Sequence, residues 1–410
     1  MKCRHCAAPL QLPFLDLGSA PPSNAYLDAT ALDAPEVWYP LRLLVCTQCW
    51  LVQTEDYAGR EALFASDYGY FSSVSSSWLA HARQFVQEAL PRFALGAGSM
   101  VVEVAANDGY LLQYVRDAEV PCYGIEPTAL TAAAARARGI SIIERFFGVE
   151  LARQLVVEGR QADLMVANNV LAHVPDINDF VAGFAQLLKP AGVASFEFPH
   201  LLEMVRGKQF DTAYHEHYSY LSLHSVQRVL HGGGMQVFDV QQLSTHGGSL
   251  RVFAQRADTG VRVVTAEVAR LLALESDSGM QSAGFYRGFQ DQAHHIKWEL
   301  LEFLLRCKRE GLSVAAYGAA AKGNTLLNFA GVRADLLSYV VDRSPGKLGR
   351  YLPGSRIPVR DVAHLLAHRP DRVLILPWNL KSEVMAQLPQ VTQWGGRFVT
   401  AVPMLELLLA

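Results

Sequence analysis

Two stretches of the chain alternate strand-like and helix-like segments, and this alternation restricts the fold more than any other feature. In the first stretch, apolar runs predict strands and helical patterns lie between them: strands at 100–104, 122–126, 163–169 and 192–198, helices at 110–116, 129–138 and 180–188. The second stretch repeats the alternation over 313–376, with a helix from about Lys322. Strands that alternate with helices form a parallel sheet covered by helices. The sequence therefore predicts an α/β protein with two Rossmann-like units.

The 410 residues are too many for one hydrophobic core, so two or three domains are expected. No proline occurs between Pro199 and Pro345, and residues 262–310 show a helical pattern typical of a long connector. We predict an N-terminal module over 1–70, a first α/β domain over 71–260, and a helical connector with a second α/β domain over 261–410.

Charge and hydropathy argue against several classes of protein. The net charge is -3 and no basic stripe is visible, so nucleic acid is not an expected partner. No uncharged apolar run of membrane-spanning length appears, and Met1–Cys6 lacks the apolar core of a signal peptide. Six cysteines are too few for a disulfide scaffold. We therefore expect a cytoplasmic protein without a membrane partner.

Four of the cysteines form two Cys-x2-Cys pairs around a proline-rich segment: Cys3, Cys6, Cys46 and Cys49. Two such turns can place four thiolates around Zn²⁺ in a tetrahedron. A thioredoxin-like dithiol would need a surrounding βαβ pattern, and four buried thiols would leave the duplicated spacing unexplained. The pairs predict a zinc site, and four thiolates leave no open position for substrate, so the zinc is expected to be structural.

A small-residue turn follows the first strand and predicts a site for a nucleoside cofactor. The turn lacks the glycine pattern of a dinucleotide fingerprint, but Glu126 ends the next strand, where a carboxylate can accept hydrogen bonds from both ribose hydroxyls. This series fits a class I methyltransferase that binds S-adenosylmethionine, although Glu126 as a solvated strand end is the plain alternative. The expected cofactor-binding residues are Glu103, Asn107, Asp108, Gly109, Glu126 and Asn169.

The segment 214–218, Tyr-His-Glu-His-Tyr, is rich in groups that can move protons. Histidine suits general-base work because its ordinary pKa of about 6.5 lies near neutral pH. His215 and His217 stand two apart, so a shared metal would require a strand. A surface histidine cluster is the structural alternative. The polar turn 245–249 either lines the same cleft or is an ordinary hairpin loop.

A second small-residue turn, 317–324, carries Lys322 at the start of a predicted helix. Backbone N–H groups and a lysine there can hold a diphosphate, and Asp342 ends the following strand as Glu126 does in the first unit. The Gly-x-Gly-x-x-Gly pattern of a nicotinamide site is absent. A degenerate domain used only for packing is the alternative.

Taken together, these motifs resemble the sugar C-methyltransferases that act on nucleotide-linked deoxysugars in antibiotic pathways. The matching blocks run nearly end to end: 39–42, 67–73, 103–110, 124–128, 168–175, 197–200, 214–220, 245–251, 317–324 and 375–379. The resemblance implies a zinc-binding module, a Rossmann-like methyltransferase domain and a C-terminal Rossmann-like domain that grips a dTDP-sugar. It also implies methylation at C-3 of a 4-keto sugar.

The resemblance places the proton-abstracting histidine at His217, with Tyr68, His173, Tyr214 and Glu216 at other active-site positions. The base would form an enolate, and Tyr214 or His173 would hydrogen-bond its oxyanion. The expected contacts of the substrate nucleotide are Lys322, Asn324, Asp342 and Trp378. Methylation of nitrogen or oxygen in another small molecule, and a non-catalytic zinc-ribbon binding protein, are the alternative functions.

Overall fold

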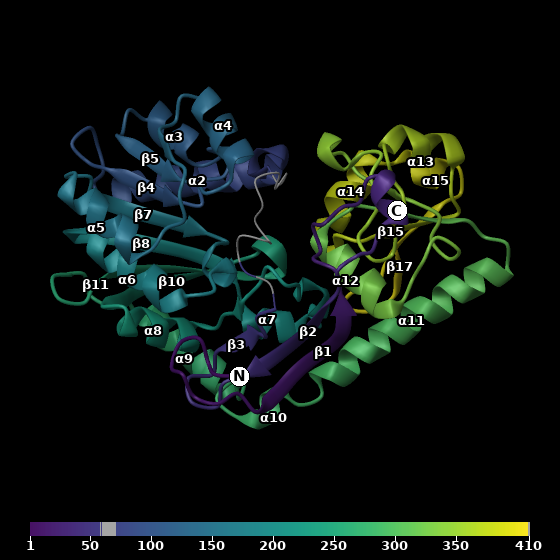
Figure 1. Cartoon of the computed structure of the whole chain (residues 1–410), viewed down its shortest axis with the longest axis horizontal. Coiled ribbons are helices and arrows are strands. Elements are labelled where there is room, and N and C mark those ends of the chain that lie inside the picture. The colour runs from purple at the N-terminus through teal and green to yellow at the C-terminus, as the bar shows by residue number, and fades with distance from the viewer. Residues whose placement is uncertain (58, 60–70, 409–410) are drawn as a thin grey trace.

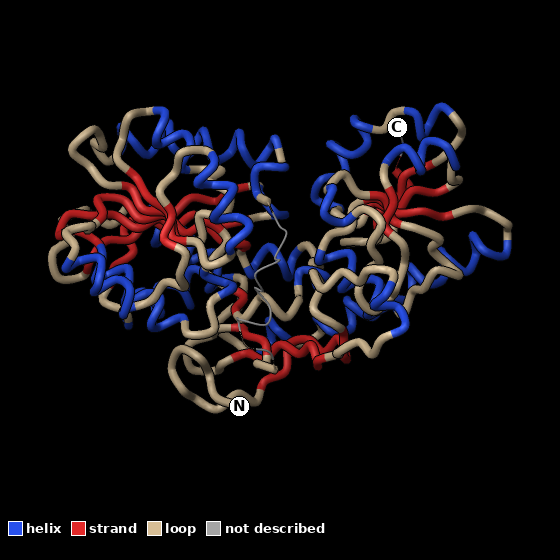
Figure 2. Tube along the Cα trace, turned by 45° about the horizontal axis from the view of Figure 1, so that its top comes forward, coloured by secondary structure: helices blue, strands red, loops and turns tan. Residues whose placement is uncertain are grey.

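A computed structural model describes residues 1–57, 59 and 71–408. Within these residues the strands form three sheets. Figure 1 shows the first α/β unit on the left and the C-terminal unit on the right, with the N-terminal strands below and between them. In Figure 2 the strands of each α/β unit lie side by side with helices around them. The predicted α/β class with a small N-terminal module is confirmed.

The first unit is built on a seven-stranded sheet whose strands run, in spatial order, β10 (Met235–Leu243), β11 (Ser249–Arg256), β8 (Leu188–Pro199), β7 (Ala162–Asn168), β4 (Val101–Val104), β5 (Cys122–Ile125) and β6 (Ile142–Ile143). The pairs from β8 to β6 are parallel, while β11 is antiparallel to β8 and β10. From β4 the chain adds β5 and β6 on one side of the sheet and then crosses to add β7 and β8 on the other side. The direction in which strands are added therefore reverses at β4. Ligands of open α/β sheets bind at such a reversal, outside the carboxyl ends of the strands.

Helices cover both faces of this sheet, since neighbouring residues of each strand point to opposite sides. On one face pack α2 (Ser76–Arg92) and α3 (Leu112–Asp117), in a core that includes Val101. On the other pack α5 (Val149–Val157), α6 (Ile177–Leu187) and α8 (Leu223–Gly232), in a core that includes Val102. The remaining helices of the unit are α4 (Ala129–Ala137) and α7 (Leu201–Arg206).

The C-terminal unit repeats this plan with a six-stranded sheet in the order β14 (Val359–Arg360), β13 (Val340–Val341), β12 (Val314–Tyr317), β15 (Arg372–Ile375), β16 (Arg397–Thr400) and β17 (Glu406–Leu408). All pairs are parallel except the last. Its helices are α12 (Ala321–Ala330), α13 (Val362–His368), α14 (Lys381–Gln387) and α15 (Gln390–Gln393). The strand order reverses between β12 and β15, which is the position where ligands bind in other open α/β sheets.

The connector is helical, as the sequence indicates, but it is broken into α9 (Ala266–Asp277), α10 (Ala283–Tyr286) and α11 (Phe289–Arg309). Gly279 and Gly288 adopt φ of 83° and 84° at the breaks, a left-handed conformation that ends a helix and favours glycine. Helix α9 packs on the seven-stranded sheet, and the long helix α11 runs beneath the C-terminal unit (Figure 1).

The N-terminal module contains more strand than its composition indicates. Its antiparallel sheet comprises β1 (Leu12–Ala20), β2 (Tyr39–Val45), β3 (Val52–Thr54) and β9 (Ser219–Tyr220). The last strand comes from the first α/β unit, directly after the 214–218 segment. Leu15 and Leu43 also share a core with Leu304 and Leu327 of the connector and the C-terminal unit. The module therefore ties the two α/β units together. In the described part of the chain, no helix is long and apolar enough to cross a membrane.

Candidate functional site

A cavity of about 380 Å³ lies where the two α/β units and the N-terminal module meet. Its walls come from the turn after β4, the carboxyl ends of β5 and β7, the 214–217 segment, the β10–β11 loop and the start of α12. Asn24 of the N-terminal module also lines it. The carboxyl ends of strands in the first sheet and the turn after β12 in the C-terminal sheet thus border one cavity.

The side of the cavity expected to bind the methyl donor contains strained backbone, both in the turn after β4 and directly after β7. Ala105, Asn107 and Asn169 line it with φ of 55°, 50° and 56°, a region that non-glycine residues seldom adopt. The carboxylate of Glu126 braces the turn, because it accepts the backbone N–H of Asn107 and of Thr128, each at 2.9 Å. Backbone strain of this kind persists where surrounding contacts enforce it, and it clusters at ligand sites.

These residues fit a nucleoside that carries an amino acid. Glu126 lines the cavity at the position expected to meet ribose hydroxyls. The side-chain oxygen of Asn169 is buried without a hydrogen-bond partner among the described residues, which suits a ligand's polar group. The turn after β4 and the ends of β5 and β7 are therefore the candidate site for S-adenosylmethionine.

Three of the residues expected at the donor do not line the cavity. Asp108 pairs with Arg138 at 2.9 Å and hydrogen-bonds Ser73. Glu103 is fully buried beneath the turn, and burial raises its pKa well above the ordinary value. Gly109 has φ of 79°, a left-handed conformation that favours glycine. These three residues support the turn without contacting the cavity.

The 214–218 segment is neither helix nor strand; it is a turn closed by a hydrogen bond from the His217 N–H to the Tyr214 carbonyl at 2.9 Å. His215 points away from the cavity, with its Nε2 3.2 Å from the carbonyl of Tyr39. The two histidines therefore do not share a metal. The hydrogen bond made by the His217 ring determines which of its nitrogens carries the proton.

Two of the histidines that line the cavity, His173 and His217, are held by backbone carbonyls. The Nδ1 of His217 lies 3.0 Å from the Thr212 carbonyl, and the Nδ1 of His173 lies 2.9 Å from the Glu216 carbonyl. Since a carbonyl only accepts, each Nδ1 carries the proton and each Nε2 carries the lone pair. Burial lowers the pKa of His173 to about 4, and burial also lowers the pKa of His217 well below its ordinary value. Both imidazoles are neutral at pH 7.

Tyr214 and Glu216 also line the cavity. The rings of Tyr214 and His217 lie 3.9 Å apart, centroid to centroid. The carboxylate of Glu216 accepts from the side-chain amide of Asn24, and burial raises its pKa to about 7. Tyr68, the remaining expected catalytic residue, lies outside the described residues.

On the acceptor side, Lys322 lines the cavity from the first turn of α12. Its Nζ donates to the Asn379 side chain at 2.9 Å and lies 4.6 Å from the centre of the Trp378 ring. Burial lowers the pKa of Lys322, while the charge on Asp211 opposes that shift. Lys347 also lines the cavity and donates to the Ala319 carbonyl at 2.7 Å. Two cations therefore face the space in front of the C-terminal sheet.

The other three expected nucleotide contacts serve structure at this edge. Asn324 donates to the Ser23 carbonyl at 2.6 Å. Asp342 accepts the backbone N–H of Ala319 at 2.8 Å, which repeats the contact that Glu126 makes in the first unit. Trp378 donates its indole N–H to Asp211 at 2.8 Å. None of the three lines the cavity.

Sequence reasoning missed Asn24, Lys347 and Trp78 as cavity residues, and it left the 245–249 turn undecided between a cleft wall and a hairpin loop. The structure shows that the turn is both: it joins β10 to β11, and His246 within it lines the cavity. The only signal at Trp78 is that it begins the apolar residues at helical spacing that form α2. No local pattern marks Asn24 or Lys347.

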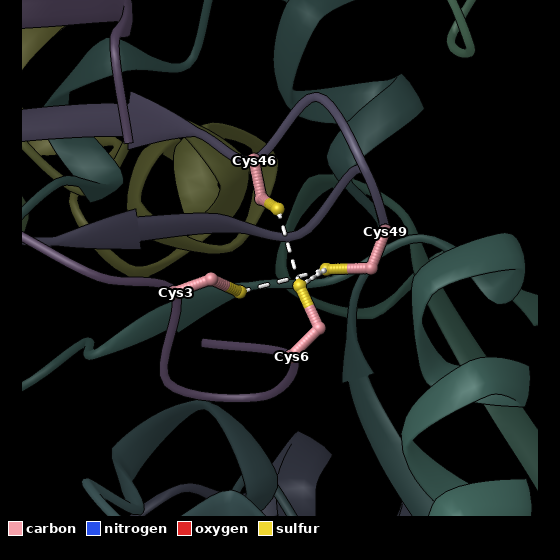
Figure 3. Close-up of side chains that lie close together, drawn as sticks. All are labelled: Cys3, Cys6, Cys46 and Cys49. Atoms are coloured by element: carbon pink, nitrogen blue, oxygen red, sulfur yellow. Dashed lines mark hydrogen bonds between the residues drawn. The ribbon is translucent and has the colours of Figure 1, made fainter. Parts of the chain in front are cut away.

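The four N-terminal cysteines converge at one point, as Figure 3 shows. Their sulfur atoms all lie within 4.8 Å of one another, with separations of 3.5 Å for Cys3–Cys49 and for Cys6–Cys46 and 3.7 Å for Cys6–Cys49. Four sulfurs around Zn²⁺ at about 2.3 Å lie about 3.8 Å apart in a regular tetrahedron. The cluster fits a structural zinc ion.

Comparison with known proteins follows the same division of the chain. Residues 3–64 match the family described as "Putative zinc binding domain", residues 78–240 match a methyltransferase domain, and residues 244–403 match a C-methyltransferase C-terminal domain. The C-methyltransferase NovU of Streptomyces niveus is 33% identical over 402 residues, which span 98% of this chain and 95% of that protein. The chain belongs to the C-methyltransferase family.

The predicted family and cofactors of this C-methyltransferase, S-adenosylmethionine and structural zinc, are confirmed. Two solved methyltransferases are similar to less than half of the chain. Magnesium protoporphyrin IX methyltransferase from Synechocystis PCC 6803 is 16% identical, with a TM-score of 0.36 over 43% of this chain and 83% of its own. The glycopeptide N-methyltransferase MtfA is also 16% identical, with a TM-score of 0.35 over 43% of this chain and 95% of its own.

Proposed function

We propose that this C-methyltransferase transfers a methyl group to C-3 of a dTDP-linked 4-keto-deoxysugar through an enolate. One observation carries the proposal: a neutral imidazole, His217, stands in a cavity bounded by a donor-binding turn on one side and by two cations on the other. The family supplies the carbon-methylating activity, and the cations suit a substrate that carries a diphosphate.

Different residues bind the methyl donor and the acceptor. Glu126 and the strained turn hold the donor, and bound S-adenosylmethionine supplies an electrophilic methyl group on its sulfonium. Lys322 and Lys347 attract the diphosphate of the acceptor to the C-terminal unit. Placing both ligands in one cavity converts a bimolecular step into an intramolecular one.

His217 removes the proton from the carbon beside the keto group. Its Nε2 holds the lone pair because Nδ1 donates to the Thr212 carbonyl, so the tautomer is fixed before substrate arrives. The imidazole accepts the proton at Nε2, and the C–H electron pair delocalises onto the keto oxygen as an enolate. A base in this position typically accelerates such a step by about 10²–10⁴-fold.

The enolate oxygen needs a hydrogen-bond donor. Neutral His173 donates through Nδ1 to the Glu216 carbonyl, so its Nε2 is an acceptor and cannot stabilise an oxyanion. That role therefore falls to the hydroxyl of Tyr214, which lines the cavity beside His217.

The test measures exchange of the C-3 proton with solvent deuterium in dTDP-4-keto-deoxysugars, in the absence of donor. We expect the wild type to exchange this proton and His217→Asn to do so about 10²–10⁴-fold more slowly. His231→Asn makes the same change on the exposed end of α8 and serves as the control. Undiminished exchange in His217→Asn would remove the assigned base. With labelled donor, a methyl group located by NMR on nitrogen or oxygen would replace the proposed reaction.

A further inference from the structure

His246 lies at the tip of the hairpin between β10 and β11, in a backbone conformation that its side chain disfavours. Its φ and ψ are 55° and 20°, and the next two residues, Gly247 and Gly248, have φ of 88° and 117°. Glycine adopts this left-handed region without penalty, whereas histidine does not. A hairpin that needed only to turn would favour glycine or asparagine at position 246 as well. The conformation of the turn therefore does not explain why residue 246 is a histidine.

Contacts on both sides of His246 hold the loop in this conformation. The hydroxyl of Thr245 donates to Glu197 at 3.1 Å, and the side-chain amide of Gln209 donates to the Gly247 carbonyl at 2.8 Å. The hydroxyl of Ser249 donates to the Thr245 carbonyl at 2.9 Å. Strain maintained by several independent contacts is typical of residues that are held ready for a ligand.

The imidazole of His246 faces the cavity with unused hydrogen-bonding capacity. Its ring packs edge-on against Trp78, with centroids 5.1 Å apart, and lines the cavity wall. Its Nδ1 is buried and has no hydrogen-bond partner in the part of the chain that the structure describes. Buried polar atoms of folded proteins are nearly always paired, so an orphan that borders a cavity points to a bound partner.

The position of the loop indicates which ligand this is. A Cβ at Gly247 would lie 2.6 Å from the ring of Trp378, so the loop packs directly against the C-terminal unit. Burial lowers the pKa of His246, the nearby charge of Lys322 adds to that shift, and the carboxylate of Glu197 opposes it. His246 therefore lies beside the C-terminal unit, in the same cavity lining as the cation proposed to hold the diphosphate.

We propose that His246 is a substrate-binding residue that hydrogen-bonds an oxygen or nitrogen substituent of the acceptor sugar ring, close to the carbon that receives the methyl group. The inference rests on the proposed function, since it takes the acceptor to be a nucleotide-linked keto sugar. A neutral imidazole offers one donor and one acceptor, so it can select between a hydroxyl or amino group and a position that lacks one.

The test compares His246→Asn and His246→Gln with the wild type and with His231→Asn. Asparagine tolerates the left-handed conformation and places its amide near the position of Nδ1, whereas glutamine reaches the position of Nε2. The readouts are the KM and kcat for dTDP-4-keto-deoxysugars, the Kd of S-adenosylhomocysteine by calorimetry, and the midpoint of thermal unfolding.

We expect at least one variant to raise the KM for the sugar by about tenfold or more, with an unchanged Kd for S-adenosylhomocysteine and an unfolding midpoint no lower than that of the wild type. A KM equal to that of the wild type in both variants would overturn the inference, and so would an equal loss of S-adenosylhomocysteine affinity, which would make His246 a donor contact. If the wild type methylates none of the sugars, the proposed function fails and this inference fails with it.

Discussion

The side-chain amide of Asn24 lies 3.0 Å and 2.8 Å from the two carboxylate oxygens of Glu216, across 192 positions of the sequence. This contact joins the N-terminal module to the segment that carries His217. The Asn24 amide donates to the buried carboxylate of Glu216 where water would otherwise do so. One neutral amide does not offset the free-energy cost of removing a charged carboxylate from solvent. The pKa of Glu216 accordingly rises from 4.5 to about 7.

Glu216→Gln should stabilise the protein at high pH. A folded-state pKa above the unfolded value means that the folded chain binds the proton more tightly, so the stability contributed by Glu216 is lost as pH rises from about 4.5 through about 7. The full difference is about 3 kcal/mol. Glutamine carries no charge and keeps an acceptor for Asn24, so we expect a higher urea midpoint than wild type at pH 8 and a shrinking advantage toward pH 5.5.

The control for this experiment is Glu88→Gln, because Glu88 is exposed on α2. Its midpoint should follow that of the wild type at both pH values. An advantage of Glu216→Gln that is equal at pH 5.5 and pH 8 would contradict the raised pKa, since a charge-independent effect has no reason to follow protonation.

Glu126→Ala should weaken donor binding without abolishing acceptor binding. The carboxylate lines the donor side and braces the turn through the N–H groups of Asn107 and Thr128, so its removal costs both contact and preorganisation. We expect the Kd of S-adenosylhomocysteine, measured by calorimetry, to rise by about tenfold or more. Glu158→Ala, which lies outside the cavity lining, is the control; equal affinities for all three proteins would refute the assignment.

Lys322→Met should weaken the binding of dTDP. The change keeps most of the apolar stem and removes the charge that faces the cavity. A hydrogen bond to a charged group contributes about 1.5–3 kcal/mol, so we expect the Kd of dTDP to rise by about 10- to 150-fold. Lys347→Met should show a change in the same direction.

Lys381 serves as the control for the lysine variants, because it lies in the same unit but pairs with Glu406 outside the cavity lining. Lys381→Met should bind dTDP like the wild type. If Lys322→Met and Lys347→Met both retain full affinity, the diphosphate must lie elsewhere.

Cys49→Ser should release zinc and lower the midpoint of thermal unfolding. Cys49 belongs to the four-sulfur cluster, and the turn that carries it leads directly into β3, which pairs with β9 after the 214–218 segment. Removing one ligand leaves three thiolates, and binding of a structural metal contributes directly to folding. Metal analysis should find about one zinc per wild-type chain and none in the variant. Cys122→Ser, outside the cluster, should keep its zinc; retention of full zinc by Cys49→Ser would disprove the site.

Features that depend on neighbours in the chain were predictable from the sequence. The alternation of strands and helices specified both α/β units, because a period of two or 3.6 residues records which side of an element is buried. The duplicated Cys-x2-Cys spacing specified the zinc ligands, and Glu126 was identified because it ends a strand beside a small-residue turn. The density of titratable groups marked the 214–218 segment, and the family resemblance selected His217 within it.

Only the tertiary structure decided how these residues act. The proton of His217 is placed on Nδ1 by the carbonyl of Thr212, and the proton of His173 by the carbonyl of Glu216. Asp108 was expected at the donor but turns to Arg138, while Lys347 enters the cavity without any local signal. The physical reason is that hydrogen bonds, burial and charge depend on the groups that packing brings together, and those groups come from distant parts of the chain.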